Sequence, residues 1–140
     1  MLAKTPENEN AKANSMPRFV ILTHDHPHLH WDFLLEEGEV LRGWRLAEEP
    51  MAGKPIVATS QVDHRVLYLD YEGPVSGNRG TVMRWDFGEY RLEPPSREAS
   101  PRASRVGAQL ALQITGTRLH GRVELQQVSD ENWIWTFEPP

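Results

Sequence analysis

Short runs of alternating apolar and polar residues, separated by glycine and proline, constrain the fold of this chain more than any other feature. Segments 110–115, 123–126 and 133–137 alternate with the period of two that is typical of half-buried strands. The 140 residues include 11 prolines and 10 glycines, which favour many turns. The pattern therefore predicts a small, mainly β fold, either a β-barrel or a β-sandwich, rather than a helical bundle.

The length of the chain fits a single domain with a substantial core. Residues 1–16 lack periodicity and bulky apolar side chains, so we expect a flexible N-terminal tail there. The folded domain is predicted to cover residues 17–140. Residues 93–105 are rich in Pro, Ser and Arg, and we expect them to form a solvated linker between strands.

Composition excludes some kinds of chemistry and of location. The chain has no cysteine, so catalysis would depend on histidine, carboxylate, hydroxyl or a metal rather than on a thiolate. It has no apolar run of membrane-spanning length, and its first 15 residues lack a hydrophobic signal core. We therefore expect a soluble, cytoplasmic protein. The net charge of -5 argues against a nonspecific nucleic-acid coat but allows an enzyme with a local basic surface.

Residues 24–33 contain four of the six histidines together with two carboxylates. If this segment is extended, His30 and Asp32 lie on one face and bulky apolar residues lie on the other. His24 can fold back across the intervening turn as a third ligand. Imidazole and carboxylate suit Mn, Fe, Zn or Ni, so we predict a metal or catalytic site; the simpler interpretation is a polar strand whose histidines face water.

Residues 63–73 form a second segment whose side chains could take part in catalysis. His64 and Tyr68 are four residues apart and share a face whether the backbone is extended or helical, so both can contact an oxyanion. The alternative is structural, with Tyr68 as a core-edge aromatic and His64 as a surface residue. Downstream, the glycine turn at 76–80 carries Arg79, which could meet a phosphate.

Several motifs follow one another in a recognisable order. They are His24-Asp25, His30-Trp31-Asp32-Phe33, Asp63-His64 with Tyr68, and Gly80-Thr81-Val82 with Trp85-Asp86 and Gly88. This succession, over residues 18–137, resembles the 3′-phosphoesterase domain of bacterial ligase D. The resemblance implies a compact single-domain β-barrel of about eight strands with little helix. It also implies Mn²⁺-dependent removal of 3′-phosphates or 3′-ribonucleotides in DNA end repair.

The resemblance assigns roles to individual residues. It implies that His24, His30 and Asp32 bind the metal. His64 would contact the scissile phosphate, with Tyr68 orienting it. The implied partners are DNA or RNA–DNA 3′ ends and a separate DNA ligase or polymerase, and we expect a monomer.

Three further residues are candidates for roles at the site. Asp25 is a candidate for fixing the tautomer of an imidazole. Arg79 and Arg84 are candidates for binding the substrate.

Three positions depart from the family pattern. Leu34 stands where the family has a phosphate-binding arginine, Glu48 replaces a lysine, and Val62 replaces an acidic residue. Loss of the arginine removes charge-assisted hydrogen bonds at the place where negative charge develops in the transition state. Arg79, Arg84 or Arg42 could supply a substitute.

The departures leave other functions open. The protein could act on another substrate, or it could be a noncatalytic metal-binding or nucleic-acid-end-binding barrel. Two histidines and a carboxylate also suit metal-dependent oxidation.

Overall fold

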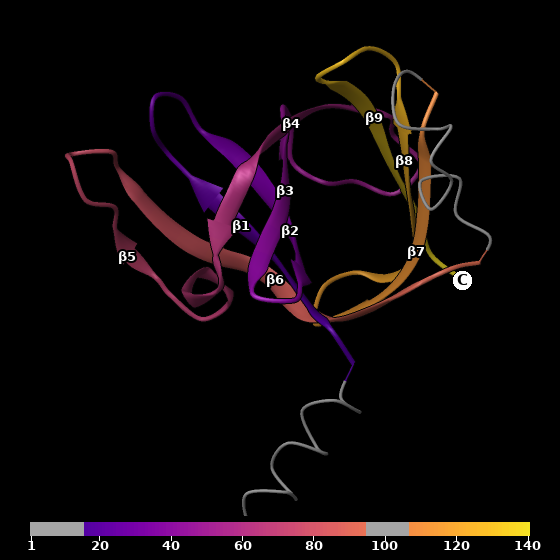
Figure 1. Ribbon diagram of the computed structural model, residues 1–140, viewed down its shortest axis with the longest axis horizontal. Coiled ribbons are helices and arrows are strands. Elements are labelled where there is room, and N and C mark those ends of the chain that lie inside the picture. The colour runs from indigo at the N-terminus through magenta and orange to yellow at the C-terminus, as the bar shows by residue number, and fades with distance from the viewer. Residues whose placement is uncertain (1–15, 95–106) are drawn as a thin grey trace, which may run out of the picture.

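The computed structural model describes residues 16–94 and 107–140 (Figure 1). The expected N-terminal tail, except Met16, and most of the expected linker lie outside the described residues. The strands are β1 (Arg18–His24), β2 (His30–Glu37), β3 (Val40–Leu46), β4 (Ile56–Arg65), β5 (Gly73–Pro74), β6 (Thr81–Leu92), β7 (Gln109–Gly116), β8 (His120–Gln127) and β9 (Asn132–Glu138). A 3₁₀ helix, η1 (Val66–Leu69), follows β4.

Eight of the strands form a closed ring. The strand order is β1-β2-β3-β4-β9-β8-β7-β6-β5, and β6 also pairs with β1, which closes the ring and leaves β5 outside it. Every pairing is antiparallel. Closure gives each of the eight strands a neighbour on both sides, so none of them is an edge. The prediction of a mainly β, compact single domain with about eight strands is confirmed.

The interior of the ring holds the larger of two hydrophobic clusters. Phe33 of β2 packs between aromatic residues of other strands, with its ring centroid 5.8 Å from that of Trp135 and 6.2 Å from that of Trp44. All three side chains are fully buried. Phe33 and Leu35 both face inward because side chains along a strand alternate between its two faces, so every second residue points into the ring.

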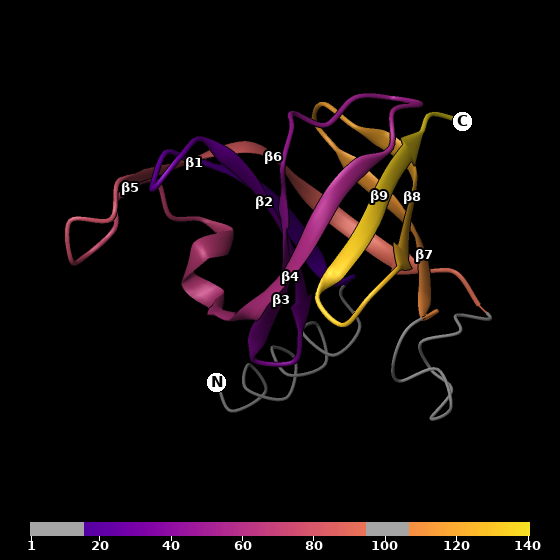
Figure 2. The same cartoon turned by 90° about the horizontal axis from the view of Figure 1, so that it is seen from above.

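A second cluster lies on the outer face of β1, β2 and β6. Its buried members are Val20, Leu22, Leu34, Leu41, Leu69 and Val82. Side chains from residues 66–75, including Tyr68, pack against it, so this part of the sheet is buried on both faces. Figures 1 and 2 show η1 and β5 on the flank of the ring away from β7, β8 and β9. This cluster therefore holds η1 against the sheet and places Tyr68 beside β1 and β2.

An ion pair fixes the end of η1. Arg18 of β1 donates from Nη2 to Asp70 Oδ1 at 2.7 Å, and this hydrogen bond holds the pKa of Asp70 below its usual value. Both side chains are exposed, so the pair itself contributes little to stability. Within the described ranges no helix has the length and apolar character needed to cross a membrane.

Candidate metal centre

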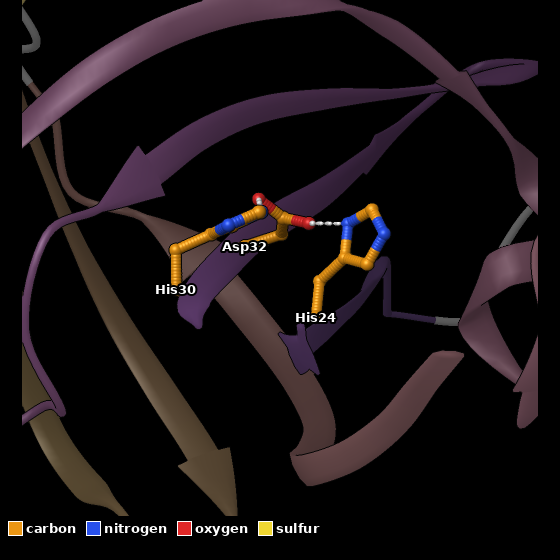
Figure 3. A group of neighbouring side chains, drawn as sticks. All are labelled: His24, His30 and Asp32. Atoms are coloured by element: carbon orange, nitrogen blue, oxygen red, sulfur yellow. Dashed lines mark ion pairs between the residues drawn. The ribbon is translucent and has the colours of Figure 1, made fainter. Parts of the chain in front are cut away.

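The hairpin of β1 and β2 brings two histidines and an aspartate onto one face. In its register His24 pairs with His30 and Leu22 pairs with Asp32. Directly opposed residues share a face, as do residues two apart on one strand, so the three polar side chains lie together on the outer face. Figure 3 shows the Asp32 carboxylate between the two imidazole rings. The sequence prediction that His30 and Asp32 lie opposite the core-facing residues agrees with this arrangement.

Backbone carbonyls determine which nitrogen of each imidazole carries the proton. His24 Nε2 donates to the carbonyl oxygen of Arg79 at 2.8 Å, and His30 Nδ1 donates to that of His28 at 2.9 Å. A carbonyl can only accept, so in the neutral rings His24 Nδ1 and His30 Nε2 are left with lone pairs. These are the nitrogens that face Asp32.

The distances around Asp32 fit a bound cation. Asp32 Oδ1 lies 3.2 Å from His30 Nε2, and Oδ2 lies 3.7 Å from His24 Nδ1. His30 Nε2 and Asp32 Oδ1 are both buried without a hydrogen-bond partner, which is costly for polar atoms. One ligand atom from each residue lies within 4.8 Å of the others. Because a cation would satisfy these facing acceptors, the residues fit a divalent transition metal.

A neighbouring loop supports this centre. The carboxylate of Asp25 accepts a hydrogen bond from the backbone N–H of Thr81 at 2.8 Å, whereas the imidazole tautomers are set by the backbone carbonyls. Gly80 has a φ of +79°, and a Cβ there would lie 2.3 Å from Asp25 Oδ1. The turn after β1 and the loop before β6 are therefore packed closely together, and the same loop supplies the carbonyl that holds His24.

A cleft of about 260 Å³ adjoins the cluster. Its polar lining includes His24, Asp32, Asp63, His64, Arg65, Tyr68 and Arg79, and its apolar lining is Leu22, Val62, Val75 and Val82. His64 Nδ1 donates to the carbonyl oxygen of Val62 at 3.0 Å, which leaves Nε2 without that partner. The rings of His64 and Tyr68 are 6.1 Å apart and nearly perpendicular. The structure thus brings the residues predicted for catalysis together with two of the predicted metal ligands.

The two predicted substrate-binding arginines lie in different surroundings. Arg79 lines the cleft, with Nε donating to the carbonyl oxygen of Ser76 at 2.7 Å. Arg84 is absent from the lining of this cleft. Its guanidinium lies 3.7 Å from Asp70 and 3.9 Å from Glu72, and it stacks 4.0 Å from the ring centroid of Phe87.

The positions that depart from the family pattern have clear physical settings. Leu34 is fully buried, and it fills the space above Gly43, where a Cβ would lie 2.5 Å from its Cδ2. Glu48 is exposed and pairs with Lys54 at 2.6 Å. Val62 is 84% exposed at the rim of the cleft. The position of the family arginine is therefore taken by a fully buried apolar side chain that does not line the cleft.

One motif residue has a structural role. Asp86 is fully buried on the inner face, opposite Ile21, and its carboxylate accepts backbone hydrogen bonds from Thr117, Arg118 and Leu119 at 2.8 to 2.9 Å. These bonds hold the turn between β7 and β8 onto β6. Gly116 faces the same carboxylate, since a Cβ there would lie 2.4 Å from Asp86 Oδ2.

Fold and site together define a class: a single-domain ring of antiparallel strands that carries a candidate divalent-metal centre on its outer face. Comparison with known families makes the assignment more specific. The family model described as the DNA ligase D 3′-phosphoesterase domain matches residues 22–127. The chain belongs to this family, and the resemblance noted from its motifs is confirmed.

Curated relatives carry the same domain within longer chains. The "Multifunctional non-homologous end joining protein LigD" of Pseudomonas aeruginosa is 28% identical over 131 residues, which cover 87% of this chain. The protein of the same name from Mycobacterium bovis is 27% identical over 121 residues, or 83% of this chain. In both cases the match spans only 15% of the length of the relative.

Proposed function

We propose that this protein is a metal-dependent phosphoesterase that acts on 3′ ends of DNA, removing a 3′-phosphate or a 3′-ribonucleotide in end repair. The observation that carries the proposal is the convergence of His24 Nδ1, His30 Nε2 and the Asp32 carboxylate beside a cleft that also contains His64 and Tyr68. Family membership and the names of the relatives, which include non-homologous end joining, support the same role.

The metal that we propose for this centre is Mn²⁺. When bound, such an ion supplies positive charge that polarises a phosphoryl oxygen and makes water a better nucleophile. His24 and His30 would hold it through the nitrogens that their hydrogen bonds to backbone carbonyls leave free, and Asp32 through its carboxylate. Three protein ligands leave positions for substrate and water, as catalysis requires.

The other residues of the cleft act on the phosphate. In hydrolysis, water attacks phosphorus, the bond between phosphorus and the 3′ oxygen breaks, and that oxygen takes up a proton. His64 would donate this proton from Nε2, the ring nitrogen that its hydrogen bond to Val62 leaves available, and water would release the proton that restores it. The hydroxyl of Tyr68 would donate a hydrogen bond to a phosphoryl oxygen. The guanidinium of Arg79 would add charge-assisted bonds from the loop side of the cleft.

A second candidate function is binding without turnover. Leu34 is buried and apolar where the family has an arginine, so the charge that would stabilise the transition state is missing from that position. Such a protein would show metal-dependent affinity for DNA ends but would release no product.

A gel assay separates the two functions. Purified protein with Mn²⁺ is incubated with a primer-template that ends in a 3′-phosphate or in a single 3′-ribonucleotide. His30→Ala is tested in parallel, and His120→Ala, an exposed histidine on β8, is the matched control. Wild type and His120→Ala should remove the terminal group, whereas His30→Ala should not.

Two results would refute the phosphoesterase proposal. Full activity of His30→Ala would mean that the cluster is not the catalytic centre. Absence of product from wild type, with Mn²⁺ binding demonstrated by calorimetry on the same sample, would favour the binding function instead.

A further inference from the structure

Arg45 lies on the strand next to the candidate metal centre and belongs to none of the sequence motifs described above. It is on β3, directly opposite Asp32 of β2, and its partner on β4 is Thr59. Opposed residues of an antiparallel pair share a face and have Cβ atoms roughly 4.5–5.5 Å apart. Arg45 is exposed, and within residues 16–94 and 107–140 its guanidinium has no hydrogen bond or ion pair. An unpaired cation therefore stands next to the carboxylate of a candidate metal ligand on the outer face.

The register also relates Arg45 to the position of the missing arginine. Leu34 pairs with Gly43, two residues before Arg45, so positions 34 and 45 are diagonal neighbours. Diagonal neighbours are about 7–8 Å apart, within reach of a long side chain. Gly43 has no side chain, and the buried side chain of Leu34 fills the space beside it. Leu34 is covered by the outer cluster, and Gln61 Oε1 and His64 Nδ1 lie 3.4 and 3.7 Å from where a Cβ of Gly43 would be. Arg45 therefore approaches the centre from the side of Asp32, its direct partner, and not over Leu34.

Other nearby arginines are less suited to this place. Arg84 is engaged with Asp70 and Glu72. Arg42 pairs with Glu37 and lies over the ring of Trp44.

Arg65 lines the cleft from the end of β4, where its partner on β3 is Val40, and it lies six residues along β4 from Thr59, the partner of Arg45. Arg79 approaches from the loop that holds His24, on the opposite side of the cluster. Arg45, on the strand beside Asp32, and Arg79, in the loop beside His24, therefore stand on opposite sides of the candidate ligands; of the two, Arg79 lines the cleft.

We propose that Arg45 binds the terminal phosphate at this centre and so replaces, from the neighbouring strand, the guanidinium that position 34 lacks. This inference rests on the proposed function. A guanidinium presents parallel N–H groups to two phosphate oxygens. A terminal phosphate monoester has three non-bridging oxygens, whereas an internal phosphodiester has two. Two flanking arginines therefore favour a DNA end that carries a 3′-phosphate over one that carries a 3′-hydroxyl.

The test compares the binding of two single-stranded oligonucleotides that differ only in having a 3′-phosphate or a 3′-hydroxyl. Fluorescence anisotropy with Mn²⁺ present is read after rapid mixing, before the 3′-phosphate can be removed, for wild type, Arg45→Ala and Arg45→Lys at several salt concentrations. Arg91→Ala is the matched control, because Arg91 is an exposed strand arginine that lies nine residues along β6 from Val82, about 30 Å by strand rise. Removal of the 3′-phosphate is followed on the same samples.

Arg45→Ala should lose about tenfold of the preference for the 3′-phosphate, which corresponds to roughly 1.4 kcal/mol. The slope of log affinity against log salt should fall by about 0.7, the value for one lost phosphate contact on a single strand. Arg45→Lys should restore the salt slope but only part of the preference, because an ammonium lacks the planar fork. Arg91→Ala should behave as wild type.

The outcomes distinguish this inference from the proposed function. If wild type removes the phosphate and Arg45→Ala binds and cleaves equally well, the role of Arg45 is overturned while the phosphoesterase stands. If wild type binds 3′-phosphate ends without turnover and Arg45→Ala loses the preference, the role of Arg45 stands and hydrolysis is refuted. A preference lost together with Mn²⁺ affinity would mean that Arg45 only supports the metal centre, which also overturns the proposal.

Discussion

Replacement of Asp86 should destabilise the protein strongly without changing its metal site. Asp86 Oδ1 accepts hydrogen bonds from the backbone N–H groups of Phe87, Thr117 and Arg118 and from the Thr117 hydroxyl, all at 2.8 to 2.9 Å. Oδ2 accepts from the N–H of Leu119 at 2.9 Å. Asp86→Ala would remove the acceptor of all three N–H groups of the turn at once.

The expected cost follows from these bonds. Each buried donor left unsatisfied costs about 1–3 kcal/mol, so three would cost roughly 3–9 kcal/mol if the turn stayed dry. Water can enter at the turn and satisfy part of this loss, so we expect about 3–5 kcal/mol for Asp86→Ala, a large share of the stability of a typical domain. Asp86→Asn keeps one oxygen but turns an NH₂ group toward the N–H of Leu119, and it should cost about 1–3 kcal/mol.

Urea unfolding followed by tryptophan fluorescence measures this cost. Glu89→Ala, an exposed carboxylate on the same strand, is the control and should change stability by less than about 0.5 kcal/mol. The Mn²⁺ affinity of folded Asp86→Asn should equal that of wild type, since Asp86 faces the interior and the candidate ligands face outward. A cost below about 1 kcal/mol for Asp86→Ala, with an unchanged m-value, would refute the reasoning.

Three further predictions concern the cleft and the pH dependence of stability. Leu34→Arg should cost at least about 3 kcal/mol in urea unfolding because it places a charge at a fully buried apolar position. It should leave the rate of 3′-phosphate removal near that of wild type, because Arg45 already supplies the guanidinium; a clear gain in rate would mean that no other arginine fills the role. Gly80→Ala should weaken Mn²⁺ binding about tenfold or more in calorimetry, because the new Cβ displaces the loop that holds His24. Gly53→Ala is the control, since Gly53 has a similar φ but lies in open space, and it should leave the affinity unchanged. Equal Mn²⁺ affinities of the two variants would contradict a role of this loop in metal binding. Burial and nearby carboxylates raise the pKa of Tyr90 to about 12 from its ordinary value of 10.0, so the folded phenol keeps its proton while the unfolded one ionises. Stability should therefore fall as the pH rises from 10 to about 12, and this slope should be absent in Tyr90→Phe; a slope that persists would exclude Tyr90 as its source.

The sequence predicted the face of a side chain correctly where the alternation of residues along a single strand is sufficient to determine it. His30 and Asp32 share a face because they are two residues apart, and the bulk of Phe33 and Leu35 identifies the opposite face as the inner one. Residues 19–22 were harder to interpret, because an uninterrupted apolar run does not show which side chains face inward. In the structure both of its faces are buried, by the interior of the ring and by the outer cluster.

Features that depend on the pairing between strands could not be predicted from the sequence. The place of Arg45 opposite Asp32 follows from the register of β2 and β3, and a shift of one residue would turn its side chain toward the interior. The burial of Leu34 requires η1, which lies more than 30 residues later in the chain. The ion pair of Arg84 with Asp70 could not be predicted from spacing either, since 13 residues separate the two in the chain and the outer cluster brings them together.

Arg79 touches the candidate metal centre and the cleft at the same time. Its carbonyl holds the imidazole of His24, while its guanidinium lines the cleft and is bonded within its own loop to Ser76. We expect an anion that draws the guanidinium away from Ser76 to alter how this loop holds His24, which would couple binding in the cleft to binding at the candidate metal centre. Coupling of this kind is reciprocal: whatever factor the metal adds to the affinity for a phosphate, the phosphate must add to the affinity for the metal.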